Sequence, residues 1–168
     1  MKLRRHAALD RFGILVAVTL LGALATVSAH AQGATCSLTA TSLTFGNYVP
    51  FSSTPTDVTA TITVNCSATG SSTVPIAGTI GLTSTSTSYS RQLTNGTYIV
   101  RYHTYTDFAR TTFWGNGTGL GVTQSVSGSV GPSAPFQQVF TVYGRIPALQ
   151  STAYVGSYAD LITATLNY

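Results

Sequence analysis

The residues that could carry acid–base or nucleophilic chemistry are few in this sequence. Beyond position 31 it contains one histidine, His103, and three aspartates, Asp57, Asp107 and Asp160, with four arginines but neither lysine nor glutamate. Serine is abundant, but no Gly-x-Ser-x-Gly motif occurs, and side chains that could activate a serine are scarce. We therefore expect no enzymatic activity and no cofactor, and a secreted hydrolase is only a distant third hypothesis.

Two kinds of chemistry are open to Cys36 and Cys66, the two cysteines of the chain. In an exported protein an even number of cysteines favours a disulfide, and closing this loop would stabilise the fold by roughly 3–4 kcal/mol. A metal site would need further ligands, and beyond position 31 only His103 could add an imidazole. We predict a Cys36–Cys66 disulfide and no metal site.

The start of the chain has the organisation of a secretion signal. The first eleven residues are basic, residues 12–27 are apolar, and Ala29-His30-Ala31 is a small-x-small cleavage sequence, with cleavage after Ala25 as an alternative. We predict a signal peptide over residues 1–31 and a single domain over residues 32–168. After cleavage we expect no integral membrane segment.

The charge of the exported part excludes one large class of partner. Its four arginines outnumber its three aspartates by one. A nucleic-acid-binding domain needs a clustered basic surface that so few charges cannot form. We expect no nucleic-acid partner.

Apolar and polar residues alternate along most of the exported part, so strands must position these few groups. The period of two predicts strands over residues 57–66, 76–82, 97–105, 122–130, 138–143 and 159–168. Turn dipeptides such as Asn95-Gly96 and Asn116-Gly117 lie between them. After Val27 no stretch has a convincing helical period. The pattern predicts an all-β protein, an antiparallel β-sandwich of about seven strands.

Several segments resemble the signatures of the spore coat protein U domain family. They are Tyr105–Thr118 (YTDFARTTFWGNGT), Tyr143–Pro147 (YGRIP), Gly156–Asp160 (GSYAD) and, nearer the N-terminus, Cys36, Phe45–Tyr48 (FGNY) and Cys66. The resemblance covers nearly the whole exported part, in the order of the family.

The family is similar to the subunits of archaic, Csu-type chaperone–usher pili. The resemblance implies an immunoglobulin-like β-sandwich that lacks its final strand and is completed by a donor strand from a partner. The implied partners are a periplasmic pilus chaperone, an outer-membrane usher and neighbouring pilin subunits. The implied route leads through the periplasm to a cell-surface pilus or the extracellular space.

On this interpretation the last strand flanks a donor-strand groove. Its aligned residues, Ile162, Ala164, Leu166 and Tyr168, are the candidate groove residues. Cleavage after Ala31 would leave only residues 32–35 ahead of Cys36, which span at most roughly 14 Å. That is too short to fill a groove, so we expect a subunit that accepts a strand but does not donate one.

Other side chains have both a binding and a packing interpretation. Phe113 and Trp114, in a Gly-flanked loop, could form a surface-binding loop or cover the edge of the core. The tyrosines Tyr98, Tyr102 and Tyr105 could stack on sugars or pack between strands. Packing is favoured for both groups. Asp107 and Arg110 are expected to form an ion pair in a local turn, and Arg145 and Asp160 to pair or cap turns similarly.

The leading hypothesis is a secreted structural or adhesive subunit of a chaperone–usher pilus, contributing to attachment or biofilm. The alternative is a self-contained coat or carbohydrate-binding β-sandwich module. Dependence on a chaperone would favour the former, and an independently stable monomer would favour the latter.

Overall fold

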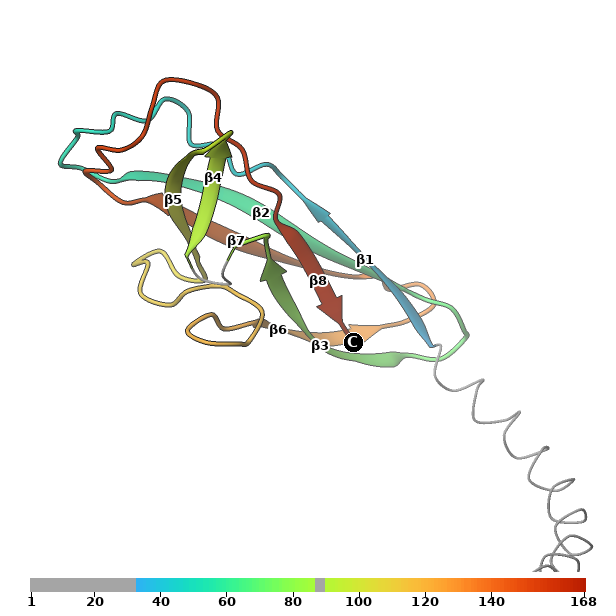
Figure 1. Cartoon of the computed structure of the whole chain (residues 1–168). Coiled ribbons are helices and arrows are strands. Elements are labelled where there is room, and N and C mark those ends of the chain that lie inside the picture. Colours follow the sequence, from blue (N-terminus) through green and yellow to red (C-terminus); the bar gives the residue numbers. More distant parts are fainter. Residues whose placement is uncertain (1–32, 87–89) are drawn as a thin grey trace, which may run out of the picture.

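The fold consists of eight strands and was obtained as a computed structural model that describes residues 33–86 and 90–168 (Figure 1). The strands are β1 (Ala34–Ala40), β2 (Thr56–Ala68), β3 (Val74–Thr83), β4 (Arg91–Asn95), β5 (Tyr98–Tyr105), β6 (Gln124–Val130), β7 (Phe136–Ile146) and β8 (Thr163–Asn167). No helix occurs among the described residues. The all-β prediction is confirmed, and the predicted signal peptide, residues 1–31, lies outside the described residues.

The strands form two antiparallel sheets. One has the order β1-β2-β7-β5-β4 and the other the order β6-β3-β8. The long pair β2 and β7 forms the centre of the first sheet, in a register that places Ile62 opposite Phe140 and Asp57 opposite Arg145. The chain enters the second sheet at β3, β6 and β8, and the two sheets face each other as an incomplete β-sandwich.

The core follows the period-two pattern of the sequence. The inward side chains of the two sheets, together with Trp114, make up one continuous cluster: Ala60, Ile62, Val64, Cys66, Ile76, Ile80, Leu82, Val126, Val130, Phe140 and Val142. The outward positions of β2 are all polar, and threonines, which suit the wet face of a strand, occupy half of them. A second, smaller cluster of Val100, Tyr102 and Ile146 lies beside it.

The bounds of all the predicted strands differ somewhat from those of the structure, and two strands are shorter by two residues or more. The strand expected over 122–130 begins at Gln124, and the strand expected over 159–168 shrinks to β8. The second change has a clear cause. Ala159 exchanges two backbone hydrogen bonds with Thr94, so the chain runs along β4 of the first sheet before it enters β8 of the second. One continuous strand cannot belong to both sheets here.

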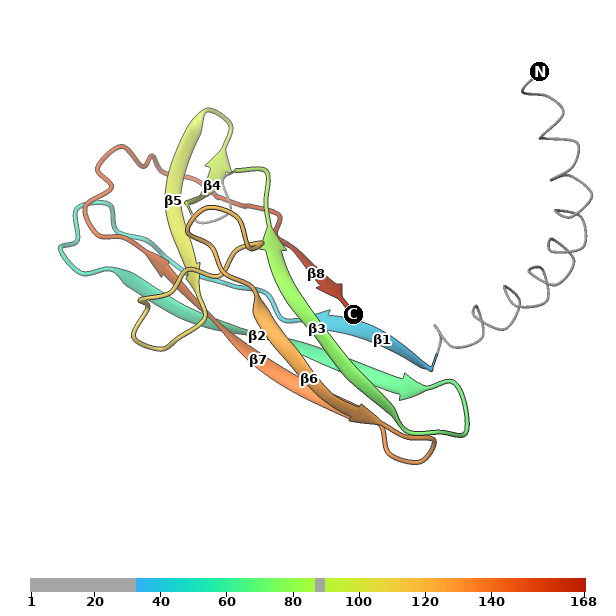
Figure 2. The same cartoon turned by 90° about the horizontal axis from the view of Figure 1, so that it is seen from below.

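The sandwich has unpaired strands at the same side of both sheets. Among the described residues, β1 pairs only with β2 and β8 pairs only with β3. Both views show β1 and β8 side by side, along the same side of the molecule (Figures 1 and 2). This side is where one further strand would complete the sandwich.

Candidate strand-accepting groove

Among residues 33–86 and 90–168, the edges of β1 and β8 that border the groove have no strand partner. Just outside the two ends of β1, the Thr41 N–H bonds to Thr61 O and the Thr69 N–H bonds to Gly33 O. The same register makes the odd-numbered residues of β1 the ones that bond to β2. In an antiparallel ladder the alternate residues then point their N–H and C=O groups away from the partner strand. The free edge of β1 therefore presents the backbone groups of Cys36, Leu38 and Ala40.

A cavity of about 290 Å³ lies between the two sheets at this open side. Its walls come from the end of β1 and the loop after it, from β2, β7 and the segment leading into β8, and they include Leu43, Phe45, Ile62, Leu82, Ile162 and Ala164. Leu161 is at the rim and 76% exposed. The cavity is mainly apolar and has room for further inward side chains.

Three of the four predicted groove residues face the core. Ile162, Ala164 and Leu166 are half-buried and pack against the main cluster. Tyr168 is 59% exposed, and its hydroxyl accepts a hydrogen bond from the Cys36 N–H at 3.1 Å. The alternation predicted for the last strand is present, and Tyr168 reaches across to the free edge of β1.

The predicted disulfide is present and holds the β1 wall of the groove. Cys36 and Cys66 are bonded and directly opposite each other in the β1–β2 register, with their Cα atoms 4.1 Å apart. The short Cα distance is typical of a pair whose backbone groups do not bond each other. The edge strand β1 is thus covalently attached to the centre of its sheet.

One end of the cavity is polar. The Tyr102 hydroxyl donates a hydrogen bond to Asp160 Oδ2 at 2.8 Å, and both residues line the cavity. Burial, with the hydrogen bond to Asp160, raises the pKa of the Tyr102 phenol well above its usual value, so Tyr102 remains a donor. The expected pairing of Asp160 with Arg145 is therefore wrong, because Tyr102 takes this carboxylate.

A buried positive charge, that of Arg91, interacts with Asp160, and the sequence analysis did not single out this arginine. Arg91 is fully buried, and its charge interacts with Tyr102 and Asp160. Its Nε donates to Thr104 Oγ1 at 3.1 Å and its Nη2 to Leu82 O at 3.0 Å and Trp114 O at 3.3 Å. Burial lowers the pKa of this guanidinium. A signal was available, because the Asn95-Gly96 turn before the predicted strand 97–105 implies a partner strand ahead of it, and that strand begins at Arg91.

Trp114 is in the core and cannot form a surface-binding loop. Its side chain is 0% exposed, its Nε1–H donates to Ile80 O at 3.1 Å, and its ring meets Phe140 edge to face. The surface-loop interpretation of Trp114 is wrong, since an indole both buried and hydrogen-bonded between sheets has no free face. Phe113 is half-buried and stacks on Tyr105 with ring centroids 5.0 Å apart.

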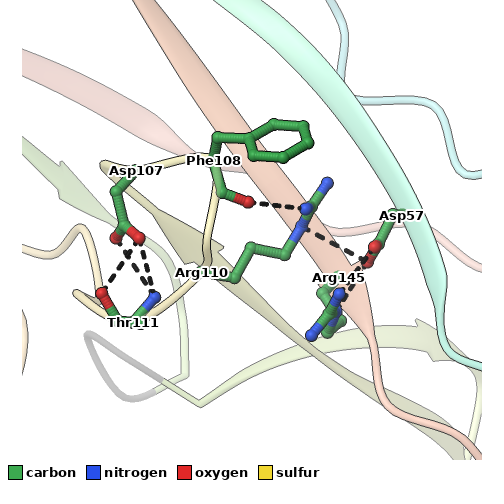
Figure 3. A network of polar contacts seen from close by, with 6 residues as sticks. All are labelled: Asp57, Asp107, Phe108, Arg110, Thr111 and Arg145. Carbon is green, nitrogen blue, oxygen red and sulfur yellow. Dashed lines mark hydrogen bonds and ion pairs between the residues drawn. The ribbon is translucent and has the colours of Figure 1, made fainter.

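A second polar network lies on the outer face of the first sheet and joins the family-like segments (Figure 3). Asp57 accepts two hydrogen bonds from Arg145, both at 2.7 Å, and its Oδ1 lies 3.3 Å from Arg110 Nε. The hydrogen bonds from Arg145, aided by the charge of Arg110, lower the pKa of Asp57. The expected Asp107–Arg110 ion pair is wrong, because Arg110 pairs with Asp57.

Asp107 closes the turn that positions Arg110. Its carboxylate accepts hydrogen bonds from the backbone N–H groups of Thr111 and Thr112 at 2.8–3.2 Å, which lower the pKa of Asp107. Arg110 adopts a left-handed backbone conformation, with φ of 57°. Its guanidinium lies 5.8 Å from the ring centroids of both Phe108 and Tyr143. Through the ion pair with Asp57 and the cation–π contacts of Arg110, the network attaches this loop to the sheet.

The other candidate binding residues contact neighbouring aromatic rings, although Tyr98 is 43% exposed. Tyr102 and Tyr105 are buried, while Tyr98 stacks on Tyr154 with centroids 4.8 Å apart. The His103 ring contacts Tyr105 and Phe113. Residues 33–86 and 90–168 contain no group of three or more side chains suited to holding a metal ion. In the same part of the chain, no helix has the length and hydrophobicity needed to cross a membrane.

Comparison with known proteins identifies the family. The family model described as the Spore Coat Protein U domain matches residues 22–165. Among curated proteins none matches the sequence significantly. The family is a structural one, associated with subunits of the chaperone–usher pilus type. Since the matched region covers most of the chain, this protein belongs to the Spore Coat Protein U domain family.

Proposed function

We propose that this protein is an exported pilus subunit whose incomplete sandwich accepts a donor strand from a partner. The observation that carries the proposal is that, within the described part of the chain, the outer edges of β1 and β8 have no strand partner and lie on either side of a mainly apolar cavity. Family membership supports the same function.

One partner, an inserted strand, would both pair the free strand edges and fill the cavity. An inserted strand would bond to the outward backbone groups of Leu38 and Ala40 and to the free edge of β8, while its inward side chains would fill the cavity. Backbone bonds supply affinity, and the pockets supply specificity. A small ligand in the cavity would leave the strand edges unpaired.

The partners follow from this function. A periplasmic chaperone would lend a strand during export, and a neighbouring pilin would replace it as an outer-membrane usher assembles the fibre. The finished pilus would lie at the cell surface and contribute to attachment or biofilm. Cleavage after Ala31 would make this subunit an acceptor only.

Native mass spectrometry of the protein isolated from its own periplasm tests the proposal. We expect a one-to-one complex with a protein of chaperone size, and a mature mass that begins at Gln32. A free, folded monomer would overturn the proposal in favour of a self-contained coat or carbohydrate-binding module. A start at Thr26 would overturn the acceptor-only assignment.

A matched pair of variants locates the binding edge. Leu166 faces the core and Thr165 faces outward on the same strand. Leu166→Asp would bury a charge beside the groove and should abolish chaperone capture. Thr165→Asp carries the same charge on the exposed face and should be captured normally. Equal capture of both would place the acceptor edge elsewhere.

A further inference from the structure

The cavity that we assign to donor side chains has a mainly apolar lining, whose polar residues are Thr41 and Ser42 after β1, and Asp160 with Tyr102. Leu43, Phe45, Ile162 and Ala164 line the same space. Asp160 is half-buried, and its Oδ2 accepts the Tyr102 hydroxyl hydrogen bond. Among the described residues, Tyr102 is the hydrogen-bond donor to this carboxylate. Oδ1 therefore remains able to accept another bond.

Insertion of a strand would change the surroundings of Asp160. A carboxylate that is now half in water would be covered, and a covered charge is costly unless it is paired and hydrogen-bonded. Arg91 offsets part of the charge from the interior, but all its described hydrogen bonds go to Thr104, Leu82 and Trp114. An inward side chain of the incoming strand can supply a further hydrogen bond to Asp160.

From its position, Asp160 would contact a side chain of the donor strand rather than the donor backbone. The backbone of an inserted strand would lie in line with β1 and β8, and every second side chain would point into the space between the sheets. Asp160 is on the wall of that space. It would meet the tip of an inward side chain.

We propose that Asp160 is a specificity-determining residue, which selects donor strands that carry a hydrogen-bond-donating side chain at one inward position and rejects donors with a carboxylate there. The inference rests on the proposed strand-acceptor function. It adds a charged contact to a donor pattern that is otherwise mainly apolar.

A peptide scan on the mature full-length protein tests this inference. The probe is a fluorescein-labelled peptide of about ten residues, which spans about 33 Å as a strand, with valine at every inward position and serine at the outward ones. Single Val→Thr replacements are made at each inward position in turn, because valine and threonine have nearly the same shape. Binding is measured by fluorescence anisotropy.

We expect the sign of the effect to differ at one position. Elsewhere threonine buries an unpartnered hydroxyl and should weaken binding. Opposite Asp160 it should tighten binding by about tenfold, the value of a hydrogen bond to a charged group. Val→Asp at that position should weaken binding more than Val→Asp at any other.

Two protein variants connect the effect to the carboxylate. Asp160→Asn should reduce the threonine preference to about twofold or less and should relieve the penalty for aspartate. Asp107→Asn is the matched control, because Asp107 caps an exposed turn and does not line the cavity. It should leave the whole scan unchanged.

The outcomes separate this inference from the proposed function. If no peptide binds, including the all-valine probe, the strand-acceptor function fails. If the all-valine probe binds but threonine weakens binding at every position, the acceptor function stands and the role of Asp160 is refuted. The scan on the unmodified protein gives this answer even if Asp160→Asn does not fold.

Discussion

The hydroxyl of Tyr168 accepts a hydrogen bond from the backbone N–H of Cys36 at 3.1 Å, across 132 positions of sequence. The contact joins β8 of one sheet to the free edge of β1 in the other. Gly78 on β3 makes room for it, since a Cβ atom there would collide with the backbone of Asn167 and the side chain of Tyr168. The Tyr168 side chain thus already bonds to one of the backbone N–H groups of β1 to which an added strand would bond.

Hydrogen exchange at the edge of β1 tests this contact. The Cys36 amide should be protected relative to the Leu38 amide, which also points away from β2 but is not reached by Tyr168. In Tyr168→Phe the two amides should exchange at similar rates, because the hydroxyl acceptor is gone. Binding of a donor peptide should protect Leu38 in both proteins. Unchanged protection of Cys36 in the variant would refute the contact.

Removal of the disulfide should weaken the fold substantially. Replacing Cys36 and Cys66 with serine removes the closure between residues 30 apart, and we expect the free energy of unfolding to fall by about 3–4 kcal/mol. Urea denaturation monitored by circular dichroism gives the value. Reduction of the unmodified protein with dithiothreitol is the control and should reproduce the loss. A change below about 1 kcal/mol would mean that the disulfide is not a major stabilising element.

Arg91 should be far more sensitive to substitution than its exposed neighbour Arg101. Arg91→Met retains an apolar stem but removes the donors to Leu82 O and Thr104 Oγ1. The N–H of Leu82 bonds to Gly115 O, and the Leu82 carbonyl, which points to the same side of β3, would lose its hydrogen bond from the buried Arg91. We expect a destabilisation of about 2–4 kcal/mol in urea denaturation. Arg101→Met should change stability by less than about 0.5 kcal/mol, and equal effects would contradict the buried placement of Arg91.

The pH dependence of stability should carry a contribution from Asp57. Because Arg145 and Arg110 lower its pKa in the folded state, the contribution is fully present above the ordinary aspartate pKa and is lost as the pH falls through the lower, folded value. In Asp57→Asn this contribution is absent. The two proteins should therefore differ by about 1 kcal/mol or less above pH ~5, since the pair is partly exposed, and converge near pH ~2. Urea titrations across this range provide the measurement, and a difference that grows toward acid would have the wrong sign.

Trp114 provides an internal probe, since it is the one tryptophan of the chain. As its ring is fully buried, its emission should lie to the blue of that of the unfolded protein, and iodide should quench it weakly. Trp114→Phe should destabilise the fold by more than 1 kcal/mol, because Ile80 O loses its indole donor. Strong iodide quenching in the folded state would restore the surface-loop interpretation.

Much of the fold could be read from local pattern. Side chains alternate across a strand with a period of two. Apolar residues at every second position, such as Ile62, Val64 and Cys66, therefore indicate both a strand and its buried face. Likewise, an exported chain with two cysteines predicts their disulfide without knowledge of the fold. Such features depend on residues next to each other or on composition, and they are correct in the structure.

Which distant residues meet was decided by the tertiary structure alone. Asp57 pairs with two arginines because the β2–β7 register places Arg145 opposite it and the Asp107 turn brings Arg110 close. Asp160 binds Tyr102 because the chain runs along β4 before it enters β8. Sequence spacing contains no information on such partners, since a strand can pair with any other that buries its apolar face. The burial of Arg91 and the cavity between β1 and β8 exist only once both sheets are assembled.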